Sequence, residues 1–163
     1  MQHSFSITLS PFHLVLPMGE LTGEYRVTDK IAVAAILGVG QVKTKTVTVS
    51  GTREDSFFAI DAGAQFRYYP VGNFIHGMQL GAEILFVYVN LNETDSTSAS
   101  GTGLAIGPFV GYKIATNIGF TFDAQLGFDY LAVQGTASDS GISVTESDSR
   151  FGLLLNLNVG WSF

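Results

Sequence analysis

Residues Leu153–Phe163 read LLLNLNVGWSF, and their side chains alternate in kind along the chain. The residues between the bulky ones are asparagine, glycine and serine, apart from Leu154. Every second residue is apolar and most are large, namely Leu153, Leu155, Leu157, Val159, Trp161 and Phe163. A period of two predicts a β-strand with one bulky apolar face and one small polar face. The stretch alone leaves open which face is the inside of the protein.

The composition narrows the class of protein. Of the 163 residues, 46% are hydrophobic and only 13% are charged. Globular proteins carry roughly 25% charged residues, so this chain is unusually apolar. No run approaches the roughly 18 apolar residues that a spanning helix needs, and 19 glycines argue against helices. The length predicts a single domain over residues 1–163.

Several classes of function are excluded by what the sequence lacks. It has no cysteine, which excludes disulfides and thiolate metal sites. The net charge is −6 and no basic stripe is present, so we expect no nucleic-acid partner. The opening MQHSFSITLS does not have the charged and apolar regions of a signal peptide. If the protein is exported, we expect this sequence to be the mature form with an added start methionine.

Alternation of this kind recurs along the whole chain. We expect eight strands, at about Phe5–Leu16, Leu21–Val27, Ile31–Val49, Ser56–Tyr69, Met78–Leu91, Thr102–Ile114, Ile118–Gly135 and Val144–Phe163. The connections TDK, ATN and PVGNFIHG are short, whereas SGTRED, NETDSTSASG and TASDSGIS are longer and polar; PMGE is a short exception. Short turns at one end and longer loops at the other are typical of an outer-membrane barrel.

The volume of the two faces decides their orientation. In one strand the face Phe120, Phe122, Ala124, Leu126, Phe128 and Tyr130 opposes Thr121, Asp123, Gln125, Gly127 and Asp129. Side chains just fill an eight-stranded barrel, so the bulky faces do not fit inside and must meet lipid. In lipid, only a closed barrel satisfies the backbone hydrogen bonds of strands. We therefore predict an all-β, eight-stranded antiparallel up-and-down transmembrane β-barrel; the alternative is a soluble ligand-binding barrel such as a lipocalin.

Aromatic residues gather near both ends of the expected strands. Toward the short turns lie Tyr25, Tyr68, Tyr69, Phe74, Tyr112, Phe120, Trp161 and Phe163. Toward the longer loops lie Phe86, Tyr88, Phe128 and Tyr130. Two aromatic girdles are the signature of the two membrane interfaces.

Charged residues on the small, polar faces are expected to point into the barrel. The acids are Glu24, Asp61, Glu83, Asp123 and Asp129, and the bases are Arg26, Arg67, Lys113 and Arg150. Buried charges have to be paired, which predicts a network of salt bridges that plugs the lumen. The alternative is a charged constriction of a pore.

The sequence offers no convincing catalytic or metal site. The three histidines are His3, His13 and His76. A lipid-modifying barrel enzyme needs a nucleophile and a base near the outer interface, but His3 lies at the other end and His13 has no convergent serine. We expect no catalytic residue, no cofactor and, because the histidines are scattered and no acids cluster, no metal ion. The stretch NETDSTS is expected to be a solvated loop rather than a calcium site.

Two stretches extend the pattern toward the loops. In QVKTKTVTVSG, Lys43 and Lys45 share one face of a strand that continues beyond the membrane. This strand offers an edge for pairing with other proteins or lysines for lipopolysaccharide phosphates; the alternative is a solvated rim. FHLVLP and LFVYVN are apolar on both faces. Either Pro11 marks a bulge, or the upper lumen is apolar and receives a hydrophobic ligand.

The C-terminal LNLNVGWSF resembles the sorting and assembly signal of bacterial outer-membrane proteins, with Leu157, Val159, Trp161 and Phe163 as its alternating apolar residues. The whole chain resembles small eight-stranded barrels of the OmpX and OmpA-barrel type. FRYYP, GAEILFVY and GYKI…NIGFTF are similar to stretches of the DUF3575-like barrel families. No peptidoglycan-binding domain follows Phe163, so the resemblance does not imply anchoring to the cell wall.

The resemblance implies location in the bacterial outer membrane, as a monomer in contact with membrane lipid and lipopolysaccharide. It also implies insertion by the barrel-assembly machinery with periplasmic chaperones. The expected role is non-enzymatic, either structural or in adhesion-like surface interaction. A conduit for small solutes or hydrophobic ligands is the first alternative, and a lipid-modifying enzyme is a weaker one.

Overall fold

The computed structural model describes residues 3–10, 18–48, 51–92, 97–139 and 142–163, although some side chains near the loop ends of the strands are not described. These residues form eight β-strands. They are β1 (Phe5–Leu9), β2 (Met18–Arg26), β3 (Ile31–Thr48), β4 (Gly51–Gly72), β5 (His76–Asn92), β6 (Thr97–Ala115), β7 (Phe120–Asp139) and β8 (Ile142–Ser162). Within the described residues, no helix is long and apolar enough to cross a membrane.

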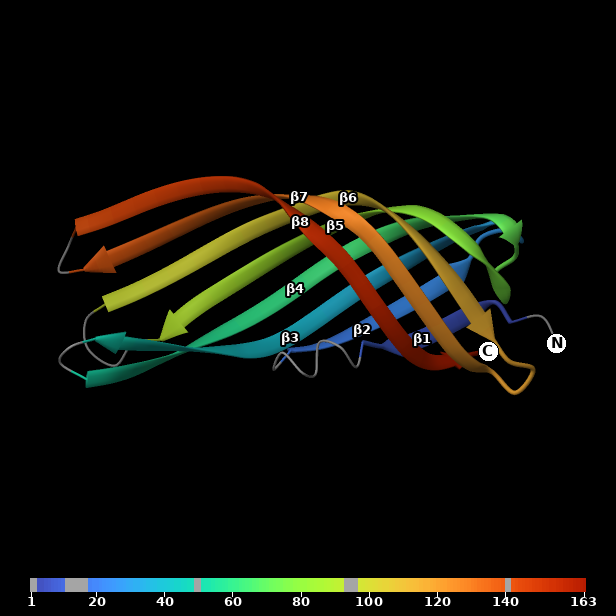
Figure 1. The fold of residues 1–163 in the computed structure, drawn as a ribbon, viewed down its shortest axis with the longest axis horizontal. Coiled ribbons are helices and arrows are strands. Elements are labelled where there is room, and N and C mark those ends of the chain that lie inside the picture. Colours follow the sequence, from blue (N-terminus) through green and yellow to red (C-terminus); the bar gives the residue numbers. More distant parts are fainter. Residues whose placement is uncertain (1–2, 11–17, 49–50, 93–96, 140–141) are drawn as a thin grey trace.

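The strands form a closed ring in the order of the sequence. Each strand pairs antiparallel with the next, and β1 pairs with β8 to close the barrel, with Ile7 opposite Trp161. Both chain ends therefore lie at the same end of the barrel (Figure 1). The predicted all-β, eight-stranded, antiparallel up-and-down barrel is confirmed.

The C-terminal stretch points its bulky face outward. Leu153, Trp161 and Phe163 are exposed on the outside of the barrel, whereas Asn156 and Ser162 are buried. The same alternation holds in the other strands, so the outer surface is apolar and the interior is largely polar. This arrangement is the reverse of a water-soluble barrel, in which the apolar face is the core.

Several strands are longer than the sequence pattern predicts. The prediction of loops at SGTRED, NETDSTSASG, TASDSGIS and PMGE is largely wrong, because most of the described residues in these stretches belong to strands. Serine and threonine backbones pair as well as apolar ones do, so the ladders continue where the apolar alternation stops. The predicted strand stretch Phe12–Leu16, with FHLVLP and Pro11, lies outside the described residues.

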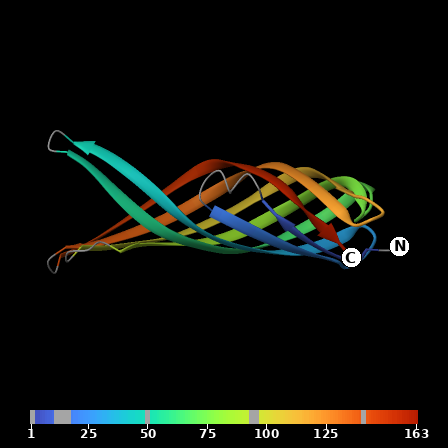
Figure 2. The ribbon, with the colours of Figure 1, turned by 90° about the horizontal axis from the view of Figure 1, so that it is seen from below.

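The loop end of the β3–β4 hairpin separates from the neighbouring strands β2 and β5. Within the described residues, β2 pairs with β3 only as far as Gly40, and β5 pairs with β4 only from Phe57. Beyond these points β3 and β4 pair with each other up to Thr48 and Gly51. Figure 2 shows this hairpin leaving the barrel on a different side from the loop ends of β5–β8.

The β4–β5 turn folds into the opposite, short-turn end. The pairing of β4 with β5 shifts register after Tyr68, and Gly72 has a φ of 82° that a residue with a Cβ rarely adopts. The turn brings Phe74 against Tyr69 and Ala32 in a buried cluster. The placement of Tyr69 and Phe74 in the outer girdle was therefore wrong. Tyr69 lies two residues after Arg67 on β4 and therefore points to the same, inward side. Phe74 lies in the turn, where strand alternation does not determine the direction of a side chain.

Candidate functional site: a polar network across the barrel interior

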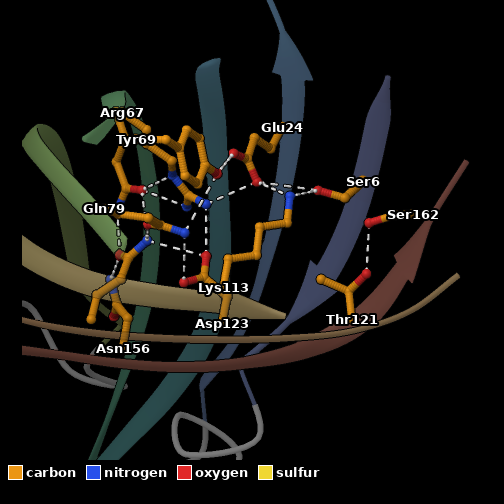
Figure 3. A network of polar contacts seen from close by, with 12 residues as sticks. Ser6, Glu24, Arg67, Tyr69, Gln79, Lys113, Thr121, Asp123, Asn156 and Ser162 are labelled. Atoms are coloured by element: carbon orange, nitrogen blue, oxygen red, sulfur yellow. Dashed lines mark hydrogen bonds and ion pairs between the residues drawn. The ribbon is translucent and has the colours of Figure 1, made fainter. Parts of the chain in front are cut away.

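Four charged side chains meet in the interior, and they are called the central network here: Glu24, Arg67, Lys113 and Asp123. The Arg67 guanidinium lies 2.9 Å from Glu24 Oε2 and 2.6 Å from Asp123 Oδ2. Lys113 Nζ lies 2.6 Å from the same Glu24 oxygen. Two cations therefore balance two anions, and all four side chains are almost completely buried. Figure 3 shows them converging from β2, β4, β6 and β7.

Glutamines surround the central network and extend it across the barrel. Gln65 Oε1 accepts hydrogen bonds from Arg67 Nε and Nη2, at 2.8 and 2.5 Å. Gln79 Nε2 donates to Asp123 Oδ1 over 3.1 Å, and Gln125 Nε2 donates to Asp123 Oδ2 over 3.2 Å. Asn156 Nδ2 donates to Gln125 Oε1 over 3.3 Å, which joins β8 to the network. Each amide can donate and accept, so these side chains satisfy one another.

The short-turn side of the central network is closed by ring and hydroxyl contacts. The Tyr69 hydroxyl donates to Glu24 Oε1 over 2.6 Å, and Lys113 Nζ donates to Ser6 Oγ over 3.0 Å. Lys113 Nζ also lies 3.6 Å from the centroid of the Phe74 ring, a cation–π contact. The Lys113 ammonium thus has an anion, a hydroxyl and an aromatic face as partners.

Alanines on β3 and a glycine on β5 leave space for the long side chains of the network. Ala32 and Ala34 are the inward residues of β3 that face this layer, and both are buried. Gly81 allows the ring of Phe109 to fill the interior, because a Cβ at position 81 would lie 2.3 Å from that ring. An eight-stranded barrel leaves little interior space, so long charged side chains fit only where their neighbours are small.

Four other acids line a separate chamber of about 200 Å³, on the loop side of the central network. The acids are Glu20, Asp61, Glu83 and Asp129. Leu85, Val87 and Leu154 also line the chamber. Glu20 and Asp61 both pair across Gly38, and the Asp61 carboxylate occupies the space that a Cβ at Gly38 would take. The expectation that no acids cluster was wrong. Among the described residues, however, no group of three or more His, Asp or Glu could hold a metal ion.

The structure divides the predicted lumen charges into three groups. Glu24, Arg67, Lys113 and Asp123 meet in the central network, and Asp61, Glu83 and Asp129 line the chamber. A hydrogen bond from Gln65 to Glu83 connects the two. Arg26 lies at the short-turn end, 3.5 Å from the exposed Asp29, and Arg150 is exposed. These two arginines are corrections to the predicted network, because Arg26 contacts Asp29 and Ser4 instead and the Arg150 side chain is exposed.

The other predicted residues lie far from the network or outside the described part. Trp161 and Phe163 are exposed on the outer surface, and Leu157 and Val159 are partly exposed on the same face of β8. Lys43 and Lys45 belong to the protruding part of β3, but their side chains are not described. His13 also lies outside the described residues.

Sequence reasoning missed several residues of the interior. Glu20 precedes Leu21, where the sequence pattern predicts the second strand to begin, although Glu20 has the same inward parity as Glu24 and belongs to β2. Alternation places Gln65, Gln79 and Gln125 on the inward faces, but the predicted network was limited to charged residues. Phe74 had no signal in the sequence, since it reaches the interior from a turn.

Fold and interior together define an eight-stranded up-and-down β-barrel with an apolar outer surface and a polar, ion-paired interior. No family model matches the chain, and no curated protein matches its sequence. The fold is similar to the crystal structure of a major outer membrane protein from Thermus thermophilus. The TM-score is 0.56 and the identity 12%, over 99% of this chain and 100% of that one. At this identity, the likeness shows the fold alone.

Proposed function

We propose that this protein is a non-enzymatic integral barrel of a bacterial outer membrane, closed to solutes and used for contacts at the cell surface. The apolar outer surface carries this proposal. Large residues such as Phe128 and Leu153, each 65% exposed, cover the outside of every strand. Soluble monomers rarely expose apolar patches beyond a few hundred Å², whereas a lipid-facing barrel needs such a belt.

The location in the outer membrane is supported by the fold of a neighbour described as an outer membrane protein. It is also supported by the C-terminal resemblance to an assembly signal at Leu157, Val159, Trp161 and Phe163. Insertion would then follow the route of such barrels, through periplasmic chaperones and the barrel-assembly machinery. Membrane fractionation of cells that express the chain with an export signal tests this. Recovery in the inner membrane or the periplasm would contradict it.

The closed lumen is supported by the burial of the central network, since Arg67 is 1% exposed and Lys113 is 0% exposed. A water-filled pore would leave such side chains hydrated. The test is conductance of the purified protein in planar bilayers. We expect no steady single-channel currents, and regular current steps that scale with protein concentration would contradict a closed lumen.

The surface role is supported by the protruding β3–β4 hairpin, which carries strand edges beyond the barrel. Exposed edges are templates for strand pairing, and Lys43 and Lys45 lie in this hairpin. Cells that display the protein should bind to surfaces coated with lipopolysaccharide, and soluble lipopolysaccharide should compete. Equal binding by cells that display Lys43→Gln/Lys45→Gln would remove the lysines from this role.

A second candidate function, binding of a hydrophobic ligand in the lumen, is favoured by the chamber beside Leu85, Val87 and Leu154. Its four acidic side chains give the chamber polar walls, which makes it a poor host for a wholly apolar molecule. Mass spectrometry of organic extracts from the purified barrel tests this function. A lipid released in equal molar amount, and lost in Leu154→Trp, would favour it over a closed and filled lumen.

A further inference from the structure

On the outer face of β5–β8, the side chains become smaller and more polar toward the loop end. The change takes place over three successive rows of residues that are paired across the strands. The first row, Ile84, Ile106, Tyr130 and Phe151, is bulky, and its Tyr130 and Phe151 rings pack edge to face, 5.6 Å apart. The next row toward the loops is Phe86, Leu104, Ala132 and Ser149, and the third is Tyr88, Thr102, Gln134 and Ser147. Bulky side chains therefore persist through all three rows on β5, end at Leu104 on β6, and are already absent from the second row on β7 and β8.

This loss of bulk forms a groove of about 450 Å³ in the outer face. Phe86 and Leu104 form its apolar wall, and Ala132 and Ser149 lie where the surface is low. Its loop side is polar, with Thr102, Gln134, Ser147 and Asp148. One end of the groove is thus continuous with the lipid-facing belt, and the other end lies where that belt gives way to polar residues. An amphipathic molecule matches such a site.

The polar end selects among membrane lipids by charge. Among the described residues that line the groove, none is a lysine or arginine and the charged one is Asp148, whose Oδ1 accepts a hydrogen bond from Ser149 N over 2.8 Å. A phosphate would therefore meet a carboxylate and no cation. Hydroxyls and an amide, in contrast, both donate and accept hydrogen bonds, which suits a head group with several hydroxyl groups.

We propose that this groove binds a membrane glycolipid, with an acyl chain along Phe86 and Leu104 and an uncharged sugar at Thr102, Gln134 and Ser147. The proposal rests on the membrane location proposed above, because the chain of the lipid reaches the groove from the lipid-facing belt. The outer face of β5–β8 near the loop end would then bind one specific lipid, whereas bulk membrane lipid covers the rest of the barrel.

Lipid retention tests the proposal. The full chain is reconstituted in phosphatidylcholine vesicles that contain a minor, equal amount of monoglucosyl diacylglycerol, phosphatidylglycerol or diacylglycerol. The barrel is then extracted in mild detergent, and the lipids that remain bound are measured by native mass spectrometry. Ala132→Leu fills the groove, and Ala64→Leu is the matched control, because Ala64 is an exposed outward residue of β4 outside the groove. Gln134→Ala removes part of the polar end without adding bulk.

We expect the wild type and Ala64→Leu to retain the glucosyl lipid in preference to the other two lipids. Ala132→Leu should lower this retention about tenfold, the change that corresponds to about 1.4 kcal/mol, and Gln134→Ala should reduce the preference over diacylglycerol. Equal retention of phosphatidylglycerol, or no loss of retention in Ala132→Leu, would overturn the proposal. Flotation with the vesicles is measured in parallel, so failure to enter the membrane, which contradicts the proposed function, is seen separately.

Discussion

At the scale of single residues, Glu24 is the centre of the interior. One of its oxygens contacts Arg67, Lys113 and Ser6, and the other accepts a hydrogen bond from Tyr69. Removal of one partner from a buried ion pair leaves the other charge uncompensated, which costs far more than the pair contributes. Loss of Glu24 would therefore leave the central network with two cations and one anion, and we expect a large loss of stability.

Glu24→Ala should lower the free energy of unfolding by about 3–5 kcal/mol, because, among the described residues, Lys113 loses its only anionic contact and Arg67 loses one of its two. The measurement is urea-induced unfolding in detergent micelles, followed by the gel migration of unheated samples. Asp29→Asn is the control; it removes the exposed contact with Arg26 and should change stability by less than about 1 kcal/mol. Equal effects of the two substitutions would contradict a central role for Glu24.

Alternation identified the members of the central network but could not pair them. Arg67 and Asp123 belong to strands that are not neighbours, and their contact depends on the register of the whole ring. The sequence also placed Arg150 beside them, because a parity rule does not say where along a strand the closed interior ends. Burial along a strand is a tertiary property, and it separates Arg67 from Arg150.

At the scale of elements, the β4–β5 turn closes the short-turn end. Asn73 Oδ1 accepts hydrogen bonds from the Ile75 and His76 backbone N–H groups, at 2.9 and 3.2 Å, which holds the turn in place. Phe74, which is buried, then packs its ring against the Lys113 ammonium. A turn residue therefore covers a charge that the strands alone leave open.

Phe74→Ala should make Lys113 accessible to a water-soluble reagent that acetylates amines. Labelling is quantified by peptide mass spectrometry, and Lys30, which is exposed, serves as the internal reference. We expect no labelling of Lys113 in the wild type or in the surface control Val71→Ala, and clear labelling in Phe74→Ala. A folded Phe74→Ala barrel with Lys113 still protected would show that the turn does not seal the interior.

The β3–β4 hairpin should be dispensable for folding. Lys43 and Ser56 are opposite each other, so residues 44–55 can be replaced by Asn-Gly, the preferred two-residue turn. The barrel below Gly40 is paired on both sides and should keep its stability. Unheated gel migration and thermal unfolding measure this, and a loss of the compact form would mean that the hairpin supports the barrel.

At the scale of the whole molecule, the apolar outer surface and the polar interior are the reverse of those of a water-soluble barrel, and this arrangement defines the class of barrel. The sequence alone predicted the ring of eight strands and the outward bulky faces, because both follow from local alternation and from the volume of a narrow barrel. It did not predict the chamber beside Asp61 or the inward Phe74, because these depend on which residues the ring brings together. The protruding hairpin was predicted only in part, since its Ser and Thr residues resemble a loop.

The central claim, that the bulky faces contact lipid, is tested most directly by the fluorescence of Trp161, the single tryptophan. Trp161 is 43% exposed on the outer face, next to Phe120 and near the short-turn end. The protein is reconstituted in phosphatidylcholine that carries bromine at different depths of the acyl chain. We predict strong quenching by bromine close to the head group, weaker quenching by bromine deep in the bilayer, and little quenching by aqueous iodide. Strong iodide quenching with no effect of brominated lipid would contradict the account.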